Sequence, residues 1–132
     1  MSTMLMLDTG VIIDFLLGRP EAVQFIGAEN SDLCVSAVTV AELYVGVRDG
    51  AERDVLNRFV GMMHTIEINR AIATQAGVWH RDYAKSHGTG LMDALIAACA
   101  ASSGAQLATL NSEHFPMLRD VRVPYRTLSA IH

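Results

Sequence analysis

The chain has 132 residues, of which 51% are hydrophobic and 18% are charged, and its formal net charge is −4 at pH 7. This length is typical of one domain, residues 1–132, and the apolar content excludes an intrinsically disordered chain. The acidic balance argues against a protein that holds nucleic acid through a broad basic surface, but it allows one that meets phosphate through metal ions.

The predicted elements alternate between short apolar strands and helices. In the first half of the chain we expect a strand at 4–7, a helix at 11–17, a helix from Pro20, a strand at 33–35, and helices at 37–47 and 52–63. In the second half we expect a strand at 64–68, a helix from 70 to about 86, a buried helix at 91–102, and strands at 106–110 and 121–125. This alternation predicts an α/β fold in which helices cover both faces of a mostly parallel sheet.

Individual residues mark several boundaries of these elements. Ser36 and Asn69 are suitable N-caps for the helices that follow them, because their side chains can accept a backbone N–H. Gly18 is expected near the end of the first helix, and Pro20 suits the first turn of the next one. Pro124 lacks a backbone N–H, so the last strand is expected at an edge of the sheet.

Two further features bear on the compartment. No apolar run is long enough to span a bilayer, and the N-terminus lacks the basic region and cleavage site of a signal peptide. Cys34 and Cys99 each lie alone in an apolar segment, which is typical of reduced core residues and not of a disulfide or a metal site. We therefore expect a cytoplasmic protein that makes no contact with a membrane.

Three carboxylates stand alone in segments that otherwise resemble core. Asp8 is the first charged side chain, Glu42 is the only one between residues 32 and 48, and Asp93 is the only one between residues 85 and 113 with histidine counted as neutral. An isolated carboxylate in apolar surroundings costs free energy unless something pairs with it. The most economical interpretation is that all three face one shared polar pocket.

The predicted topology indicates where this pocket would lie. Asp8 follows the first strand, and ligands of open parallel sheets bind beyond the carboxyl ends of strands, where the strand order reverses. Glu42 lies on the helix after the second strand, and Asp93 lies in the first turn of its helix, with Gly90 as the expected cap. Three converging carboxylates repel one another unless a cation lies between them, and oxygen ligands select Mg²⁺ or Mn²⁺.

Each carboxylate also has an interpretation that involves no metal. Asp8 would serve as a helix N-cap, Asp93 would favour a helix N-terminus through the backbone dipole, and Glu42 would point to water. Asp14, six residues after Asp8, is expected to be a surface residue that is solvated or paired with an arginine.

Four segments carry a resemblance to a known family: LDTGVIIDFL, TVAELYVGV, LMDALIAACA and LATLNSEHF. Together they resemble the PIN-domain ribonucleases, and their spacing is most similar to that of the VapC toxins of bacterial and archaeal type II toxin–antitoxin pairs. The resemblance covers nearly the whole chain. It implies a three-layer α/β/α sandwich, PIN-like, and a Mg²⁺- or Mn²⁺-dependent endoribonuclease in which a metal-activated water cleaves RNA.

The resemblance also assigns site residues. The family's acidic site falls on Asp8, Glu42 and Asp93, and a fourth position, often Asp in the family, falls on Asn111. Thr9 and Thr109 match the family's hydroxyl residues near the first and fourth positions. Because an amide brings no negative charge, Asn111 leaves open a degenerate PIN domain that acts mainly as an antitoxin-binding and regulatory partner.

Further expectations concern the surroundings of this site. Arg19, Arg48, Arg81 and Arg119 are candidates for contacts with RNA phosphates, and Glu113 and His114 are expected to be surface or loop residues. A metal phosphomonoesterase is a competing class, but Gly10 stands where a second Asp is usual for aspartyl-phosphate enzymes.

The family resemblance implies partners as well. It implies a cognate VapB-like antitoxin, a homodimer, and contact with DNA only through the antitoxin. The apolar residues expected to receive an amphipathic helix are Phe15, Leu16, Phe25, Ile26 and the segment 43–47. Part of the helix at 69–86 is a candidate for the pairing of two copies.

Overall fold

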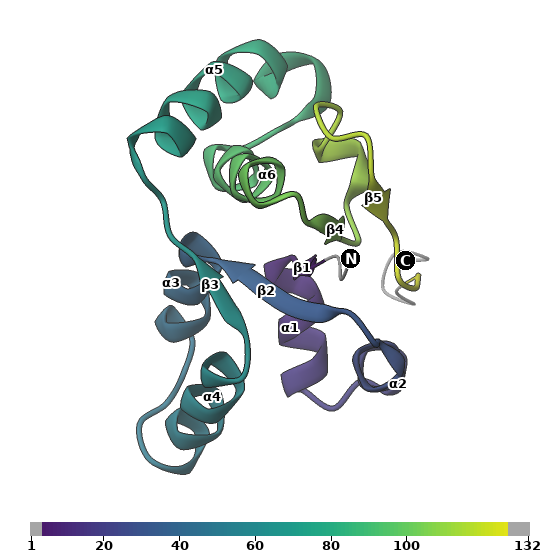
Figure 1. The fold of residues 1–132 in the computed structure, drawn as a ribbon. Coiled ribbons are helices and arrows are strands. Elements are labelled where there is room, and N and C mark those ends of the chain that lie inside the picture. Colours follow the sequence, from purple (N-terminus) through teal and green to yellow (C-terminus); the bar gives the residue numbers. More distant parts are fainter. Residues whose placement is uncertain (1–3, 127–132) are drawn as a thin grey trace.

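The computed structural model describes residues 4–126 as a five-stranded sheet with helices on both faces (Figure 1). The strands are β1 (Met4–Leu7), β2 (Asp32–Ser36), β3 (His64–Ile66), β4 (Gln106–Ala108) and β5 (Val121–Arg122). The helices are α1 (Thr9–Leu16), α2 (Pro20–Ala28), α3 (Ala37–Val45), α4 (Ala51–Gly61), α5 (Arg70–His87) and α6 (Leu91–Ser103), with a short 3₁₀ helix, η1 (Ser112–His114). These elements confirm the predicted α/β fold.

The sheet is parallel throughout and has the strand order β3-β2-β1-β4-β5. The chain runs outward from β1 through β2 to β3, and then returns through α5 and α6 to place β4 on the other side of β1. The strand order therefore reverses between β1 and β4, which is where open α/β sheets bind ligands. The edge position predicted from Pro124 is confirmed, since β5 is an outer strand.

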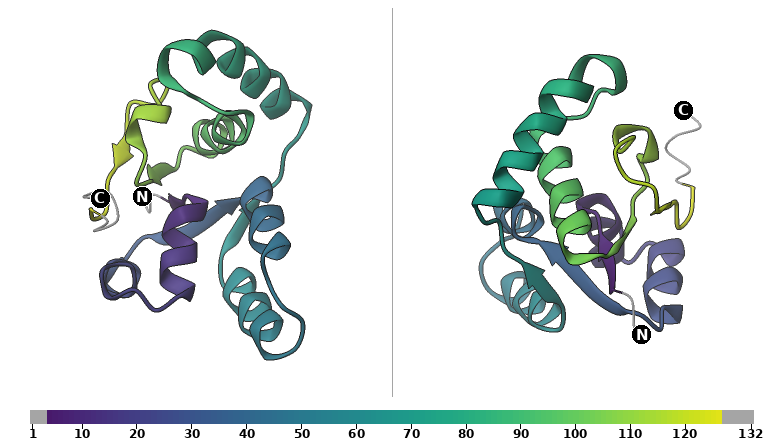
Figure 2. Two further views of the ribbon diagram at one scale, coloured as in Figure 1. Left: turned by 180° about the vertical axis from the view of Figure 1, so that it is seen from behind. Right: turned by 45° about the horizontal axis from the view of Figure 1, so that its top comes forward.

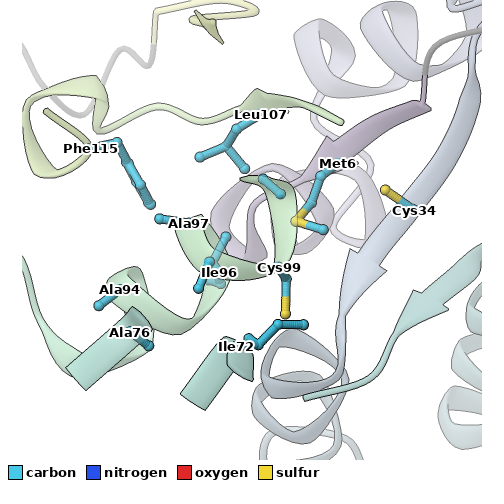
Figure 3. Close-up of a cluster of buried hydrophobic side chains, with 12 residues drawn as sticks. Met6, Cys34, Ile72, Ala76, Ala94, Ile96, Ala97, Cys99, Leu107 and Phe115 are labelled. Carbon is cyan, nitrogen blue, oxygen red and sulfur yellow. The ribbon is translucent and has the colours of Figure 1, made fainter. Parts of the chain in front are cut away.

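Alternating side chains of the strands pack into two separate hydrophobic cores, one on each face of the sheet. Met6 and Cys34 point toward α5 and α6, where they meet Ile96, Leu107 and other buried residues (Figure 3). The neighbouring strand residues, such as Leu5, Leu7 and Val35, pack on the opposite side of the sheet against α1, α3 and α4. Two views of the ribbon show α5 and α6 on one face and α1 to α4 on the other (Figures 1 and 2).

Caps fix several helix boundaries as predicted. The side chain of Ser36 accepts a hydrogen bond from the backbone N–H of Val38 at 3.2 Å, and that of Asn69 accepts one from Ile72 at 2.9 Å. The first helix begins two residues earlier than expected, at Thr9, because the carboxylate of Asp8 caps it directly.

Other expectations are tested by the packing. Cys34 and Cys99 are free and buried, as predicted. Asp14 is paired with Arg19 at 3.1 Å, which confirms its expected arginine partner, but its side chain is only 14% exposed, so the expected surface position is wrong. No helix within residues 4–126 is long and apolar enough to cross a membrane. The helix α6 is buried over most of its length, but its first two residues are about half exposed.

Candidate active site

Asp8 lies at the point where the strand order reverses. It follows β1 directly, and its backbone N–H donates to the carbonyl of Ala108, the last residue of β4, at 2.9 Å. Its Oδ1 accepts from the backbone N–H of Thr9 at 2.8 Å, and its Oδ2 accepts from the hydroxyl of Thr109 at 2.6 Å. Asp8 is therefore the N-cap of α1, as its interpretation without a metal predicted, and it also lies at the switch point.

The electrostatic surroundings of Asp8 are unfavourable to its charge. The residue is only 8% exposed. Burial raises the pKa of the Asp8 carboxyl, and the nearby charges of Asp93 and Glu42 raise it further, against the hydrogen bonds from Thr109 and Thr9 that lower it. Asp93 and Glu42 thus both lie close enough to Asp8 for their charges to act on its carboxyl.

Glu42 is held at the site by a threonine pair. Its Oε1 lies 2.7 Å from the hydroxyl of Thr9, which in turn lies 3.1 Å from the hydroxyl of the fully buried Thr39. A carboxylate only accepts, so Thr9 donates to Glu42 and Thr39 donates to Thr9. Glu42 is exposed at the surface, yet it is tied to the residue that follows Asp8.

Asp93 lies in the first turn of α6 and is held through one of its oxygens. Its Oδ2 accepts from the backbone N–H of Gly90 at 3.0 Å, and the Nδ1 of His114 lies 3.4 Å from the same oxygen. The first contact confirms that Asp93 supports its helix N-terminus. The second corrects the expectation for His114, which is only 34% exposed along its side chain and lies against a site carboxylate instead of on an open surface.

The donor set suits a hard cation, although the carboxylates are not drawn together into a coordination sphere. Within residues 4–126, no three His, Cys, Asp or Glu side chains are grouped closely enough to hold a metal ion. Glu42 accepts from Thr9, and Asp93 accepts from Gly90. The candidate ligands are nevertheless all carboxylate oxygens, and the charges of Glu42 and Asp93 raise the pKa of Asp8. Oxygen donors of this kind fit Mg²⁺ or Mn²⁺.

Asn111 begins η1 with an exposed side chain. Its backbone N–H donates to the hydroxyl of Thr109 at 3.1 Å, so the residue is linked to Asp8 through Thr109. Glu113 is exposed, as expected. The structure therefore brings Asn111 next to the site through its backbone.

The four candidate arginines have different surroundings. Arg19 pairs with Asp14 at 3.1 Å and Arg81 pairs with Asp82 at 2.9 Å, so both guanidinium groups already have a carboxylate partner. Arg119 is exposed between η1 and β5. Only the remaining candidate, Arg48, lies on a cavity wall that also carries a site carboxylate.

This cavity is an apolar groove of about 590 Å³ between α1, α3 and α4. Its lining residues are Ile13, Leu16, Leu17, Glu42, Leu43, Gly46, Val47, Arg48, Glu52, Val55 and Leu56. Of the residues expected to receive a partner helix, Leu16, Leu43, Gly46 and Val47 line this groove. Phe15, Phe25 and Ile26 do not line the groove; Phe15 stacks on Phe59 with ring centroids 4.9 Å apart, and the other two pack against the core.

The sequence analysis missed Thr39 and Thr89 and placed His114 elsewhere. Threonine is common inside folded proteins, and its role here depends on partners far along the chain. The one local signal was the break HGTG between two helices, which contains Thr89.

The fold and the site together define an α/β protein with acidic side chains at its switch point. The PIN domain family model matches residues 5–120, and the chain belongs to the PIN domain family. The chain is similar to Ribonuclease VapC10 of Mycobacterium tuberculosis, with 37% identity over 125 residues that cover 92% of this chain and 93% of that protein.

Solved structures agree with this assignment. A toxin-antitoxin complex from Klebsiella pneumoniae matches with a TM-score of 0.81 and 26% identity, covering 93% of this chain and 99% of that one. A DNA-bound VapBC from Salmonella typhimurium matches with a TM-score of 0.73 and 25% identity, covering 92% of this chain and 96% of that one. The architecture predicted from the resemblance is thereby confirmed as the fold of these VapBC proteins.

Proposed function

We propose that this protein is the toxin of a type II toxin–antitoxin pair, and that it is a metal-dependent endoribonuclease of the cytoplasm. The observation that supports this most is the buried Asp8 at the switch point of the sheet, because the charges of Asp93 and Glu42 raise the pKa of its carboxyl. The similarity to a protein named ribonuclease, along nearly the whole chain, supports the choice of RNA as substrate.

Asp8 and Asp93 would hold Mg²⁺ or Mn²⁺, with Glu42 as a further ligand directly or through water. Such an ion, when bound, supplies a water of lowered pKa for attack on the phosphodiester and offsets the charge of the phosphate. The all-oxygen donor set and the repulsion among its carboxylates support this choice of metal.

The other residues of the site position these groups. Thr109 and the N–H of Thr9 fix both oxygens of Asp8, so its side chain is preorganised before any ligand arrives. The hydroxyl of Thr9 also holds Glu42. Arg48 is our first candidate for a contact with the substrate phosphate, since a guanidinium can donate two parallel hydrogen bonds to it.

Asn111 has a different role in this proposal. Its side chain is exposed beside Thr109, where an amide would orient a water or a substrate oxygen without adding negative charge. With three carboxylates in place of four, a second metal ion is expected to bind more weakly than the first. Arg19, Arg81 and Arg119 remain weaker candidates for phosphate contacts.

The apolar groove supports a VapB-like antitoxin as partner. Exposed side chains of Leu17 and Val55 line it, and an amphipathic helix would cover them. Glu42 and Arg48 lie on its wall, so a segment in the groove would reach the acidic site. We infer that contact with promoter DNA is made through the antitoxin, and that two copies of the chain pair, with α5 as a candidate surface.

The decisive test is cleavage of total RNA by the purified chain, freed of any partner, with Mg²⁺, with Mn²⁺ and with EDTA. We expect discrete fragments only with metal, and none from the Asp93→Asn variant. Asp82→Asn is the matched control, because it makes the same change on the exposed face of α5 and should leave cleavage intact. Equal cleavage by both variants would exclude the proposed site.

A second candidate is the degenerate PIN domain, which the uncharged Asn111 favours. In that case the folded chain would bind Mn²⁺ and an antitoxin peptide but would cleave no RNA at any metal concentration. Asn111→Asp would then restore cleavage if the missing charge is the cause.

A further inference from the structure

We propose that His114 is a positioning residue that holds Asp93 in place for the metal, an inference that rests on the nuclease function proposed above. The imidazole Nδ1 lies 3.4 Å from Oδ2 of Asp93, and the backbone N–H of Gly90 donates to the same oxygen at 3.0 Å. Both contacts fall on one oxygen. The other oxygen, Oδ1, is therefore left for a ligand.

The 3.4 Å separation is that of an ion-pair contact between an imidazole nitrogen and a carboxylate oxygen. An ionised carboxylate only accepts, so this contact supports Asp93 when Nδ1 of His114 carries a hydrogen. Histidine and carboxylate pairs of this kind are a common way in which proteins orient the groups that bind a metal. Here the usual order is reversed, because the carboxylate is the ligand and the histidine orients it.

His114 itself is anchored by the loop between α5 and α6. The hydroxyl of Thr89, which is 1% exposed, donates to the carbonyl of His114 at 2.8 Å. The carbonyl of Thr89 lies 3.0 Å from Nδ1 of His80 on α5. This loop thus joins α5, η1 and the start of α6, and it gives the HGTG segment of the sequence a role.

Gly88 lies beside the ring of His114 in the same loop. It has a φ of +66°, a conformation that side chains rarely adopt, and a Cβ built on it would lie 3.7 Å from Nε2 of His114, which is an ordinary van der Waals distance. A substitution at Gly88 would therefore strain the backbone of this loop without a clash against the imidazole.

One short segment then orients both aspartates of the site. Thr109, at its start, donates to Oδ2 of Asp8 at 2.6 Å, and His114, at its end, contacts Oδ2 of Asp93 at 3.4 Å. Between them lies the turn that begins at Asn111, whose N–H is bonded to Thr109. The segment Thr109–His114 therefore contacts both aspartates.

The test compares two substitutions that differ in one property. His114→Asn keeps a nitrogen donor near the position of Nδ1, whereas His114→Leu keeps bulk and removes the donor. Mn²⁺ affinity, measured by calorimetry, should fall roughly ten-fold in His114→Leu and stay near that of the parent chain in His114→Asn. Equal affinities in all three proteins, or equal losses in both variants, would overturn the proposal.

A second measurement needs no metal. The amide of Gly90 is protected by its bond to Asp93, so we expect its hydrogen exchange in EDTA to be roughly five- to ten-fold faster in His114→Leu than in the parent. Amides in the middle of α6, such as that of Ala98, should exchange at the parental rate, which separates positioning from general loosening. Unchanged exchange at Gly90 would overturn the proposal.

Mn²⁺ affinity and the hydrogen exchange of Gly90 together distinguish a failure of the proposed metal-dependent function from a failure of the positioning role of His114. If the parent chain binds no Mn²⁺, the proposed metal-dependent function fails, and the exchange of Gly90 alone decides whether His114 holds Asp93. If the parent binds Mn²⁺ and the donor at residue 114 has no effect on either readout, the function stands and the positioning role fails.

Discussion

The two faces of the sheet differ in how completely their apolar side chains are buried. On the α5 and α6 face, Leu107 is fully buried and the alanines of α6 bring the helix close to the strands. On the other face, Leu17 is 67% exposed and Val55 is 47% exposed along an open groove. The first face is closed along the middle of α6, although Leu91 and Met92 at its start are about half exposed. The groove on the second face is the apolar surface that the proposed antitoxin would cover.

The largest effect is expected on the closed face. Leu107→Ala removes a fully buried side chain from β4 and should lower the free energy of unfolding by about 2–5 kcal/mol, because the packed core relaxes only partly around the cavity. Urea denaturation of the metal-free chain measures this directly. A loss under about 1 kcal/mol would mean that this face is not tightly packed.

The next largest effect is expected on metal affinity at Asp8, at the switch point of the sheet. Thr109→Val keeps the shape of the side chain but removes the donor to Oδ2 of Asp8. We expect Mn²⁺ affinity to fall about 10- to 100-fold, as is typical when a partner of a metal ligand is lost. Thr65→Val, on the exposed outer strand β3, is the matched control and should bind Mn²⁺ as the parent does.

Asp8→Asn should stabilise the metal-free chain near neutral pH by about 0.5–2 kcal/mol, while abolishing cleavage. Its carboxyl has a raised pKa, so the folded chain binds this proton more tightly than the unfolded chain does. Stability from this group is therefore lost as the pH rises through the window between the ordinary pKa and the raised one. The free energy of unfolding of Asp8→Asn should therefore exceed that of the parent by a growing amount as the pH rises across that window.

Thermal unfolding in EDTA from acidic to neutral pH measures this difference. Added Mn²⁺ should stabilise the parent and leave Asp8→Asn unchanged, because binding to the folded state alone raises stability. If Asp8→Asn were less stable than the parent at neutral pH, the hydrogen bonds of the Asp8 carboxylate would stabilise the fold by more than its burial and its repulsion from nearby carboxylates destabilise it.

The smallest effect is expected on the open face. Leu17→Ala makes the same change as Leu107→Ala at an exposed position, and it should alter the free energy of unfolding by no more than about 0.5 kcal/mol. The same substitution should weaken the binding of the antitoxin, measured by calorimetry. If it destabilised the free chain as much as Leu107→Ala does, the contrast between the two faces would be wrong.

Much of the fold was predictable because its signals are local. The apolar runs of β1 and β4, the caps at Ser36 and Asn69, and Pro124 beside the edge strand each depend on a few adjacent residues. The boundary at Thr9 was misplaced, since Asp8 was weighed as a cap for a helix starting at Val11.

The candidate site was predictable only where charge interrupts an apolar segment. Asp8, Glu42 and Asp93 stand out in this way, and the structure brings the other two within electrostatic reach of Asp8. Charge gives no sign of the residues that support them. Thr9 and Thr109 were named only through the family resemblance, because the contact of Thr109 with Asp8 joins residues 101 positions apart. A neutral His114 carries no comparable signal, and its ring is placed by the loop that contains Thr89.

The position of the segment Thr109–His114 near the end of the chain has a consequence for synthesis on the ribosome. Every residue that lines the groove lies before residue 57, whereas Asp8 gains its hydroxyl donor only after residue 109 has been translated. Pairing of β1 with β4 is also a long-range step, and such steps fold late. A nascent chain therefore carries the complete partner surface before it carries the complete acidic site.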